Sequence, residues 1–254
     1  MYIRFLRHSL QTNIFEERRN MRIEEYREMD KFRLKRNKEI LESGVNMLDI
    51  YSVYIDESVI IEPGATIDNN VTLKGSTVIK SGAHIYQSSY IEDSIIGSNS
   101  VIKSAYIYES KIGENTSVGP FAYIRPGTVI GNDCKVGDFV EVKNSNIGDG
   151  TKASHLTYIG DADIGERVNL GCGVVFVNYD GHIKQRSVIN DDAFIGCNTN
   201  IVAPVLVGEG AYIAAGATVT DDVPEDALCI ARARQTIKEH WVKQRKILKK
   251  DLNK

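Results

Sequence analysis

The sequence has few of the features that mark a metal-binding, membrane or secreted protein. Its four cysteines form no CxxC pair and no Cys/His ligand spacing, so the common zinc motifs are excluded. No apolar run approaches the roughly 18 residues of a membrane span, and the apolar part of "MYIRFLRHSLQTN" is too short for a secretion signal. We therefore expect reduced thiols, a cytoplasmic location and no integral membrane association.

The chain also lacks an excess of positive charge. It has 31 Lys and Arg against 34 Asp and Glu, a formal net charge of -3 over 254 residues. A global basic field of the kind that nucleic acid requires is absent, so we expect no nucleic-acid partner. The length is enough for one large or two modest domains with a sizeable buried core.

The charges that are present gather at the two ends. Residues 15–44 are dense in Glu, Arg and Lys, contain no Pro, and place Ile23, Tyr26 and Met29 at roughly helical spacing. This pattern predicts an exposed helix or two with a narrow apolar stripe, either a solvated arm or a partner-binding helix. The other end, "KEHWVKQRKILKKDLNK", is a basic tail that is either solvated or close to a phosphate.

Between the ends, a large aliphatic residue returns about every six positions from Ile55 to Val219. A period of six fits neither an amphipathic helix nor a hairpin strand, and it is typical of a parallel β-helix. Each hexapeptide forms one short strand and a turn, and three of them close a triangular coil with the aliphatic side chains inside. We predict an all-β protein, a left-handed parallel β-helix of hexapeptide repeats with about nine coils.

The predicted organisation has three parts. They are a helical arm and linker at 1–48, the β-helix at 49–223, and a C-terminal arm with the basic tail at 224–254. Because a β-helix ends in unpaired strand edges, the arm and the tail are natural caps for its two ends.

The repeat has its largest gap between Val177 and Ile189. The sequence there, "NYDGHIKQRSV", begins with turn residues and is too polar for the interior of the coils. We expect it to project as a loop, which is either functional or a tolerated insertion. The loop carries Tyr179, His182, Lys184 and Arg186.

Polar side chains recur on the coils before this loop, about one coil apart. Residues one coil apart stack on one face, so we expect these side chains to share one groove, with His155 and Tyr158 in turns. Two permanent cations beside a tyrosine and an asparagine suit an anionic, hydroxyl-rich ligand such as a sugar phosphate. The alternative is a solvated charged face. The residues are Arg125, Glu141, Lys143, His155, Tyr158 and Asn169.

The strings "VGPFAYIRPG", "VGDFVEVKNS", "KASHLTYIGDADIG", "VNLGCG", "VNYDG", "DDAFIGCN", "VAPVLVG" and "AYIAAGATV" carry a family resemblance. Over roughly residues 35–241 the chain resembles the acetyltransferase half of a bacterial bifunctional family. That family joins glucosamine-1-phosphate N-acetyltransferase to N-acetylglucosamine-1-phosphate uridylyltransferase. Nothing in the chain resembles the other half, with its Gly-rich LxxGxGTRM-type loop, and residues 1 to about 34 match neither half. The resemblance therefore implies acetyl transfer without uridylyl transfer.

The resemblance also implies roles for individual residues. His155 corresponds to the general base and Glu141 to a carboxylate that assists it. The sugar phosphate would be held by Arg125, Lys143, Tyr158, Asn169 and Lys184. The co-substrate acetyl-CoA would be contacted by Asn178, Tyr179, Cys197, Ala215 and Arg232. The family implies a homotrimer with active sites between subunits, and no metal.

Three other functions fit a β-helix. One is acetyl transfer to a different amino sugar. The second is a non-catalytic module that oligomerises or regulates a nucleotidyltransferase, although such a module has no need for His155, Lys143 and the long loop together. The third is a zinc hydratase of the γ-carbonic-anhydrase type, which needs several histidines around one interface. The five histidines are scattered instead: His8, His84, His155, His182 and His240.

Overall fold

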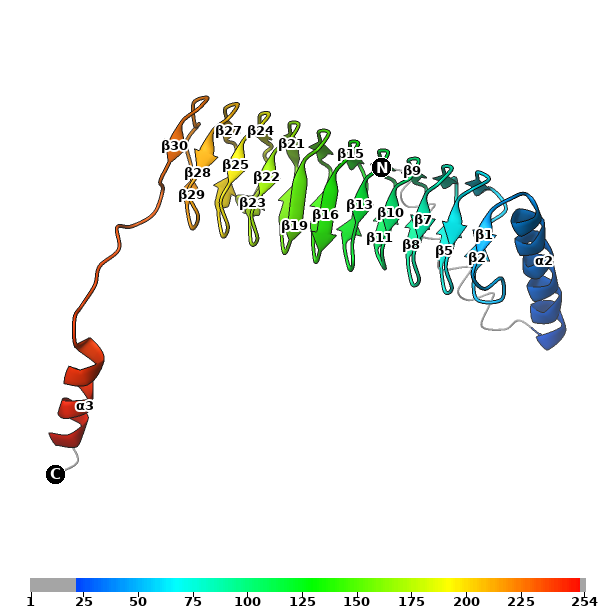
Figure 1. The fold of residues 1–254 in the computed structure, drawn as a ribbon, viewed down its shortest axis with the longest axis horizontal. Coiled ribbons are helices and arrows are strands. Elements are labelled where there is room, and N and C mark those ends of the chain that lie inside the picture. The colour runs from blue at the N-terminus through cyan, green and yellow to red at the C-terminus, as the bar shows by residue number, and fades with distance from the viewer. Residues whose placement is uncertain (1–21, 252–254) are drawn as a thin grey trace.

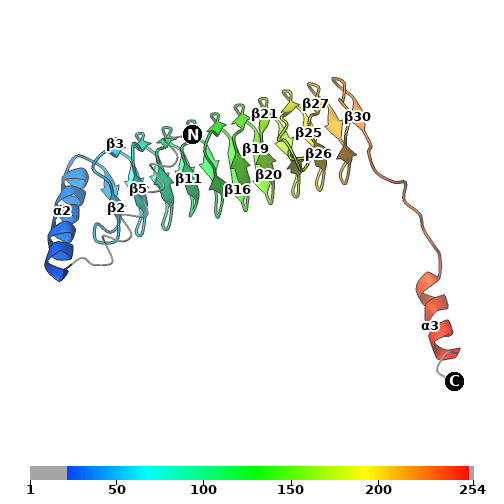
Figure 2. The same ribbon diagram turned by 180° about the vertical axis from the view of Figure 1, so that it is seen from behind.

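A computed structural model describes residues 22–251 of the chain. Residues 1–21 of the predicted arm, with His8, and residues 252–254 of the predicted tail lie outside the described residues. The described part begins with one long helix, passes through a column of coils, and ends in a second helix that stands away from the column (Figures 1 and 2).

The first helix, α2 (Ile23–Glu42), covers the open end of the column (Figure 1). It begins where the Glu25 carboxylate accepts a hydrogen bond from the backbone N–H of Arg22 at 3.1 Å, an arrangement that satisfies a free donor of the first turn. The buried Asn37 side chain donates to the carbonyls of Ile50 at 2.8 Å and Val53 at 3.1 Å. The predicted N-terminal cap is therefore present, and it works by supplying donors to the first coil.

The column has three faces, each a parallel sheet, here named sheets A, B and C. Sheet A consists of β1 (Asn46–Met47), β4 (Thr66–Ile67), β7 (His84–Ile85), β10 (Val101–Ile102), β13 (Ser117–Val118), β16 (Lys135–Asp138), β19 (Lys152–His155), β22 (Asn169–Leu170), β25 (Phe194–Ile195), β28 (Tyr212–Ile213) and β30 (Leu228–Cys229). Sheet B consists of β2 (Tyr54–Ile55), β5 (Thr72–Lys74), β8 (Tyr90–Glu92), β11 (Tyr106–Tyr108), β14 (Tyr123–Ile124), β17 (Glu141–Lys143), β20 (Tyr158–Gly160), β23 (Val175–Val177), β26 (Asn200–Val202) and β29 (Thr218–Val219). Sheet C consists of β3 (Ile60–Ile61), β6 (Val78–Ile79), β9 (Ile95–Ile96), β12 (Lys111–Ile112), β15 (Val129–Ile130), β18 (Asn146–Ile147), β21 (Ala162–Ile164), β24 (Ser187–Ile189) and β27 (Leu206–Val207).

The predicted fold, a left-handed parallel β-helix of hexapeptide repeats, is confirmed. The aliphatic residues of the six-residue repeat are buried, apart from Ile61, which is partly buried near the open end. Small polar residues at the corners are buried too, and they bond to the backbone of the neighbouring coil. Ser110, for example, donates to the carbonyl of Arg125 at 3.0 Å. Side-chain donors thus satisfy carbonyls that the short strands leave open.

The coils extend further than the six-residue repeat in the sequence. The described residues form about ten coils, since the three sheets have 11, 10 and 9 strands, against the predicted nine. The outermost strands, β1 and β30, lie outside the predicted range 49–223. Their residues pair with the stack through the backbone, which requires no aliphatic side chain at a six-residue interval.

The second helix, α3 (Trp241–Asp251), follows an extended segment after β30. Figures 1 and 2 show it away from the last coil, so the predicted capping role of the tail is not what the structure shows. Neither helix seen in residues 22–251 has the length and apolar character to cross a membrane.

Candidate functional site

His155 lies at a corner of the column, where the chain passes from sheet A to sheet B. It is the last residue of β19, and Tyr158 is the first residue of β20. We expected both side chains in turns, but only the residues between them turn, with Leu156 in the left-handed region at φ 45°. Strand ends hold the two side chains more firmly than a loop would, because each is fixed by a parallel neighbour.

The imidazole of His155 is paired with Asp138, one coil earlier. Strand pairing aligns the two residues, and Nδ1 of His155 lies 2.6 Å from Oδ1 of Asp138. Because an ionised carboxylate only accepts hydrogen bonds, we infer that Nδ1 carries the hydrogen and that Nε2 presents its lone pair. The same hydrogen bond lowers the pKa of Asp138 below its usual value.

Glu141, the carboxylate expected to assist His155, is instead paired with Arg125. Its Oε1 lies 2.7 Å from Nη1 of Arg125, and this hydrogen bond raises the pKa of the guanidinium. The reason is the corner of the coil, since Asp138 ends a strand of sheet A and Glu141 begins a strand of sheet B. The structure therefore gives His155 a different partner from the predicted one.

Sheet B carries three cations in one cluster. Arg125 follows β14, Lys143 ends β17, and Lys184 lies on the loop after β23. The nearby ammonium of Lys143, together with Arg125, lowers the pKa of Lys184. Cations held this close together favour a ligand that brings negative charge, such as a phosphate.

A buried carboxylate, Asp161, stands within this cluster, and sequence reasoning missed it. Its side chain lies 3.2 Å from Nζ of Lys143 and accepts hydrogen bonds from the amides of Asn144 and Asn178. The spacing in the sequence could have revealed it, because Asp161 follows Lys143 at the same interval of one coil at which Lys143 follows Arg125. A search for cations and a histidine passed over it.

Gly160, the residue before Asp161, leaves space for two predicted site residues. A β-carbon at this position would lie 2.5 Å from the hydroxyl oxygen of Tyr158 and 2.8 Å from the side-chain nitrogen of Asn178. Both polar groups therefore lie over the glycine, where any larger residue would displace them. Tyr158, predicted to touch the sugar phosphate, and Asn178, predicted to touch the coenzyme, are neighbours.

The predicted loop is present, and it is tied down at both ends. It runs between β23 and β24, with an isolated antiparallel bridge between Tyr179 and Lys184. Asp180 accepts hydrogen bonds at 2.8 Å from the backbone N–H groups of the two residues at the tip. At its far end, Arg186 forms an ion pair with Asp163. The loop is thus a fixed projection next to the cation cluster.

The other predicted coenzyme residues line the corner that begins at His155. The strand register, extended by two residues, stacks Cys172 below His155, Cys197 below Cys172, and Ala215 below Cys197. Backbone hydrogen bonds join the same turns, from Asn198 to Cys172 and from Gly216 to Cys197. Arg232 follows at the next passage of the chain, with its Cδ 3.7 Å from where a β-carbon on Gly216 would lie. These residues form a continuous edge that runs from the histidine to the C-terminal end of the column.

Asn169 does not share the groove that the sequence predicted. It begins β22 in sheet A, where it pairs with Lys152, whereas the cations and Tyr158 belong to sheet B. The corner of the coil again explains the difference, because a spacing of about one coil does not tell on which side of a corner a residue falls.

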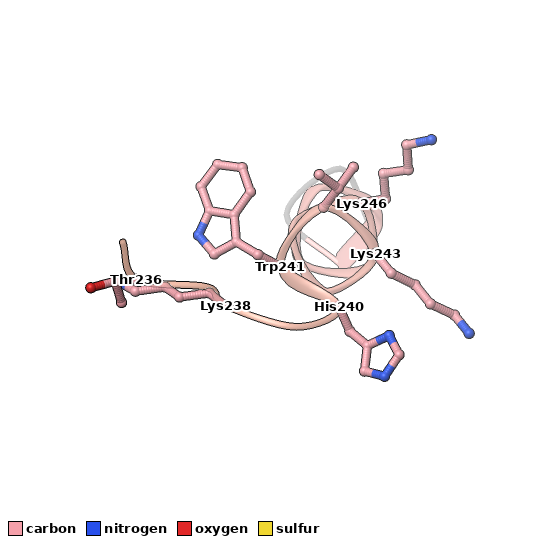
Figure 3. Close-up of a pocket in the computed structure, with 7 residues that line it drawn as sticks. Thr236, Lys238, His240, Trp241, Lys243 and Lys246 are labelled. Carbon is pink, nitrogen blue, oxygen red and sulfur yellow. The ribbon is translucent and has the colours of Figure 1, made fainter. Parts of the chain in front are cut away.

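A separate hollow lies on the tail, shortly after Arg232 in the chain. Its lining comes from Thr236, Lys238, His240, Trp241, Val242, Lys243 and Lys246. Figure 3 shows the labelled side chains pointing in different directions around the start of α3, rather than converging on one point. The candidate functional site therefore lies on the column and not in the hollow on the tail. Over the described part of the chain, no group of three or more His, Cys, Asp or Glu is placed to hold a metal ion.

The pairing of Asp138 with His155 predicts a loss of activity when the carboxylate is removed. In Asp138→Asn, the ionised acceptor that holds Nδ1 of the imidazole is gone, so the ring is no longer fixed with Nε2 free to take a proton. For the acetyl transfer that the family resemblance implies, we expect kcat to fall by about 10- to 100-fold, the usual effect of losing a hydrogen bond to a charged group. Glu141→Gln serves as the comparison, and a larger loss in that variant would restore the predicted Glu141–His155 pair.

Comparison with known proteins agrees with the hexapeptide-repeat fold. Residues 109–144 and 186–221 match the family "Bacterial transferase hexapeptide (six repeats)". The bifunctional protein GlmU of Caldicellulosiruptor saccharolyticus is 50% identical over 227 residues, which are 89% of this chain and 49% of that protein. GlmU of Clostridioides difficile is 51% identical over 226 residues, again 89% of this chain and 49% of that protein. The chain is therefore similar, over most of its own length, to about half of each GlmU protein.

The resemblance seen in the sequence is therefore confirmed. The chain spans about half the length of the GlmU proteins that it matches. A solved UDP-N-acetylglucosamine acyltransferase from Arabidopsis is 18% identical, with 73% of this chain and 69% of that chain covered and a TM-score of 0.42. That value is too low to support a statement about function.

Proposed function

We propose that the chain is a glucosamine-1-phosphate N-acetyltransferase that uses acetyl-CoA and supplies the N-acetylated sugar phosphate for UDP-N-acetylglucosamine synthesis. The observation that carries the proposal is the His155–Asp138 pair, at the corner from which sheet B extends with its cation cluster. The matched GlmU proteins are named bifunctional, and the acetyltransferase half is the one that a hexapeptide-repeat column supports. The proposed site of action is the cytoplasm.

In the proposed reaction, the amine of the sugar attacks the carbonyl carbon of the thioester. A new C–N bond forms, the C–S bond breaks, and the nitrogen must lose one proton. Nε2 of His155 takes that proton, while Asp138 holds the ring and offsets the charge of the imidazolium. The imidazolium then gives this proton to the departing thiolate. The products are the N-acetyl sugar phosphate and the free thiol of coenzyme A.

The remaining residues bind and orient the two substrates. Arg125, Lys143 and Lys184 bind the phosphate, and Tyr158 offers a hydroxyl over Gly160 to the sugar. The coenzyme lies along the corner below His155, with its acetyl end near Asn178 and Tyr179 and its far end near Arg232. Cys197 and Ala215 contact it on the way.

The position of Asn169 supports a homotrimer with sites between subunits. On sheet A, this residue faces away from the cations of sheet B in its own chain. If it contacts the sugar phosphate, it must do so from a second copy whose sheet A faces this sheet B. The fixed loop beside the cluster is placed to meet such a neighbour.

The proposal is tested by thiol release from acetyl-CoA with and without an acceptor. We expect release with glucosamine 1-phosphate, and much less with glucosamine 6-phosphate or glucosamine, because the cations are arranged for one phosphate position. Faster release with another amino sugar would change the acceptor that we propose, and acetyl transfer would remain the proposed reaction. If no acceptor increased the release, the transferase proposal would be wrong, and a non-catalytic module would take its place.

A further inference from the structure

Asp161 lies at the corner between sheets B and C, directly after β20. It adopts the left-handed conformation at φ 51°, which is uncommon outside glycine, asparagine and aspartate. The residue is only 7% exposed. A buried carboxylate in such a position is costly unless its oxygens are satisfied.

The oxygens of Asp161 are satisfied by three donors from two coils, the coil before its own and the coil after it. Oδ1 accepts from the amide of Asn144 at 2.6 Å, and Oδ2 accepts from the amide of Asn178. The ammonium of Lys143 lies 3.2 Å from Oδ2 and 3.4 Å from Oδ1. Burial by itself raises the pKa of Asp161, but the two amides and the ammonium outweigh it and keep the pKa below its usual value.

Two of these donors belong to different ends of the candidate site. Lys143 is part of the cation cluster, and Asn178 begins the loop that carries Lys184. Asn144, the residue after Lys143, completes the array, and its carbonyl accepts a hydrogen bond from Arg186 at 2.8 Å. Asp161 thus bonds the cation cluster and the start of the loop at the same time.

We propose that Asp161 is a positioning residue for the acetyl transfer, holding the Lys143 ammonium and the Asn178 carboxamide in one array. This inference rests on the proposed function. The proposal requires a carboxylate at this position. All three partners donate hydrogen bonds, and only a side chain that accepts without carrying hydrogens satisfies them all. An amide in its place would put an N–H₂ group against at least one of them.

Asp161 also limits the mutual repulsion of the cations. The charged groups that act on Lys184 are Lys143, Arg125 and Asp161, and of these only Asp161 favours the ammonium. With the carboxylate removed, Lys184 gives up its proton more readily. The cluster then loses charge at a lower pH than in the wild-type protein.

The test compares Asp161→Asn with the matched control Asp192→Asn in the full chain. Asp192 also lies at a corner in the left-handed conformation, at φ 58°, and is paired with Arg167 at 2.7 Å, but it lies outside the proposed site. Lysines carrying ¹³C-methyl groups are followed by NMR against pH, with Lys184 assigned through Lys184→Arg. We expect Lys184 to titrate at lower pH in Asp161→Asn and to stay unchanged in Asp192→Asn. Equal titration in all three proteins would overturn the proposal.

A double-mutant cycle with Lys143→Gln tests whether Asp161 acts through Lys143. Asp161→Asn alone is expected to lower kcat/KM for glucosamine 1-phosphate by about 10- to 100-fold, the effect of leaving buried donors unpaired. In the Lys143→Gln background, we expect a further loss of no more than about threefold. Equal losses in both backgrounds would show that Asp161 acts independently of Lys143. Thermal unfolding of each variant separates these effects from a general loss of folding.

The two proposals fail in different ways. If the wild-type protein releases no thiol in response to any acceptor, the proposed function is wrong, and the NMR titration still decides whether Asp161 organises the cluster. If the wild type is active and Lys184 titrates alike in all variants, the function stands and the role of Asp161 is wrong.

Discussion

Replacing His155 by alanine is expected to lower kcat for acetyl transfer by about 10²–10⁴-fold, the usual contribution of a general base. KM for glucosamine 1-phosphate should change little, because the phosphate is held by cations on sheet B and not by the imidazole. Steady-state kinetics with varied glucosamine 1-phosphate would measure both effects.

The protein contains its own control for this substitution. His84 is also on sheet A and is also paired with a carboxylate, since its Nε2 lies 2.9 Å from Oδ1 of Asp68. It lies four coils before His155, far from the cation cluster. His84→Ala should leave kcat unchanged. If both variants kept wild-type activity, His155 would have no part in the chemistry.

Lys143→Met is expected to have the second large effect, because it removes a phosphate contact and leaves Asp161 without its counter-charge. Truncating one partner of a buried charge pair typically costs about 2–5 kcal/mol. We therefore expect kcat/KM for glucosamine 1-phosphate to fall by roughly 30- to 4,000-fold, mostly through KM. Lys111→Met, at an exposed position of sheet C, is the control and should retain full activity.

The same substitution should change how stability depends on pH. The pKa of Asp161 is lowered in the folded protein, so its contribution to stability is complete above the unfolded pKa and is lost as pH falls through the folded one. Without the ammonium of Lys143, the folded pKa rises, and the contribution shrinks at neutral pH. Melting temperatures from pH 3 to 7 should converge at the acidic end. A constant difference across this range would contradict the role given to the ion pair.

The sequence predicted the column well because the prediction depends on one repeated requirement. Each coil needs an aliphatic side chain pointing inward, and residues such as Ile124 and Ile159, which are fully buried, carry that requirement in their spacing. The ends were less predictable. Strands such as β1 and β30 join the stack through backbone hydrogen bonds, which leave no periodic mark on the side chains.

The sequence predicted which residues gather at the site, but not which side chains bond to one another. Asp138 and Glu141 are three residues apart, yet the corner between them sends one to His155 and the other to Arg125. A six-residue repeat locates the inward positions and says little about the direction of the outward ones. Asp161 was missed for a related reason, since its importance comes from donors on the coils before and after its own.

Along the corner that begins at His155, contact residues on successive coils are separated by a constant distance, the spacing between stacked strands. Parallel strands stack about 4.8 Å apart, so the three steps from His155 through Cys172 and Cys197 to Ala215 span roughly 14 Å. Any group that binds along this edge meets contact points only at whole multiples of that spacing. Evolution can therefore lengthen or shorten the reach of the edge by one coil at a time, while the triangular cross-section and the corner that holds the histidine stay the same.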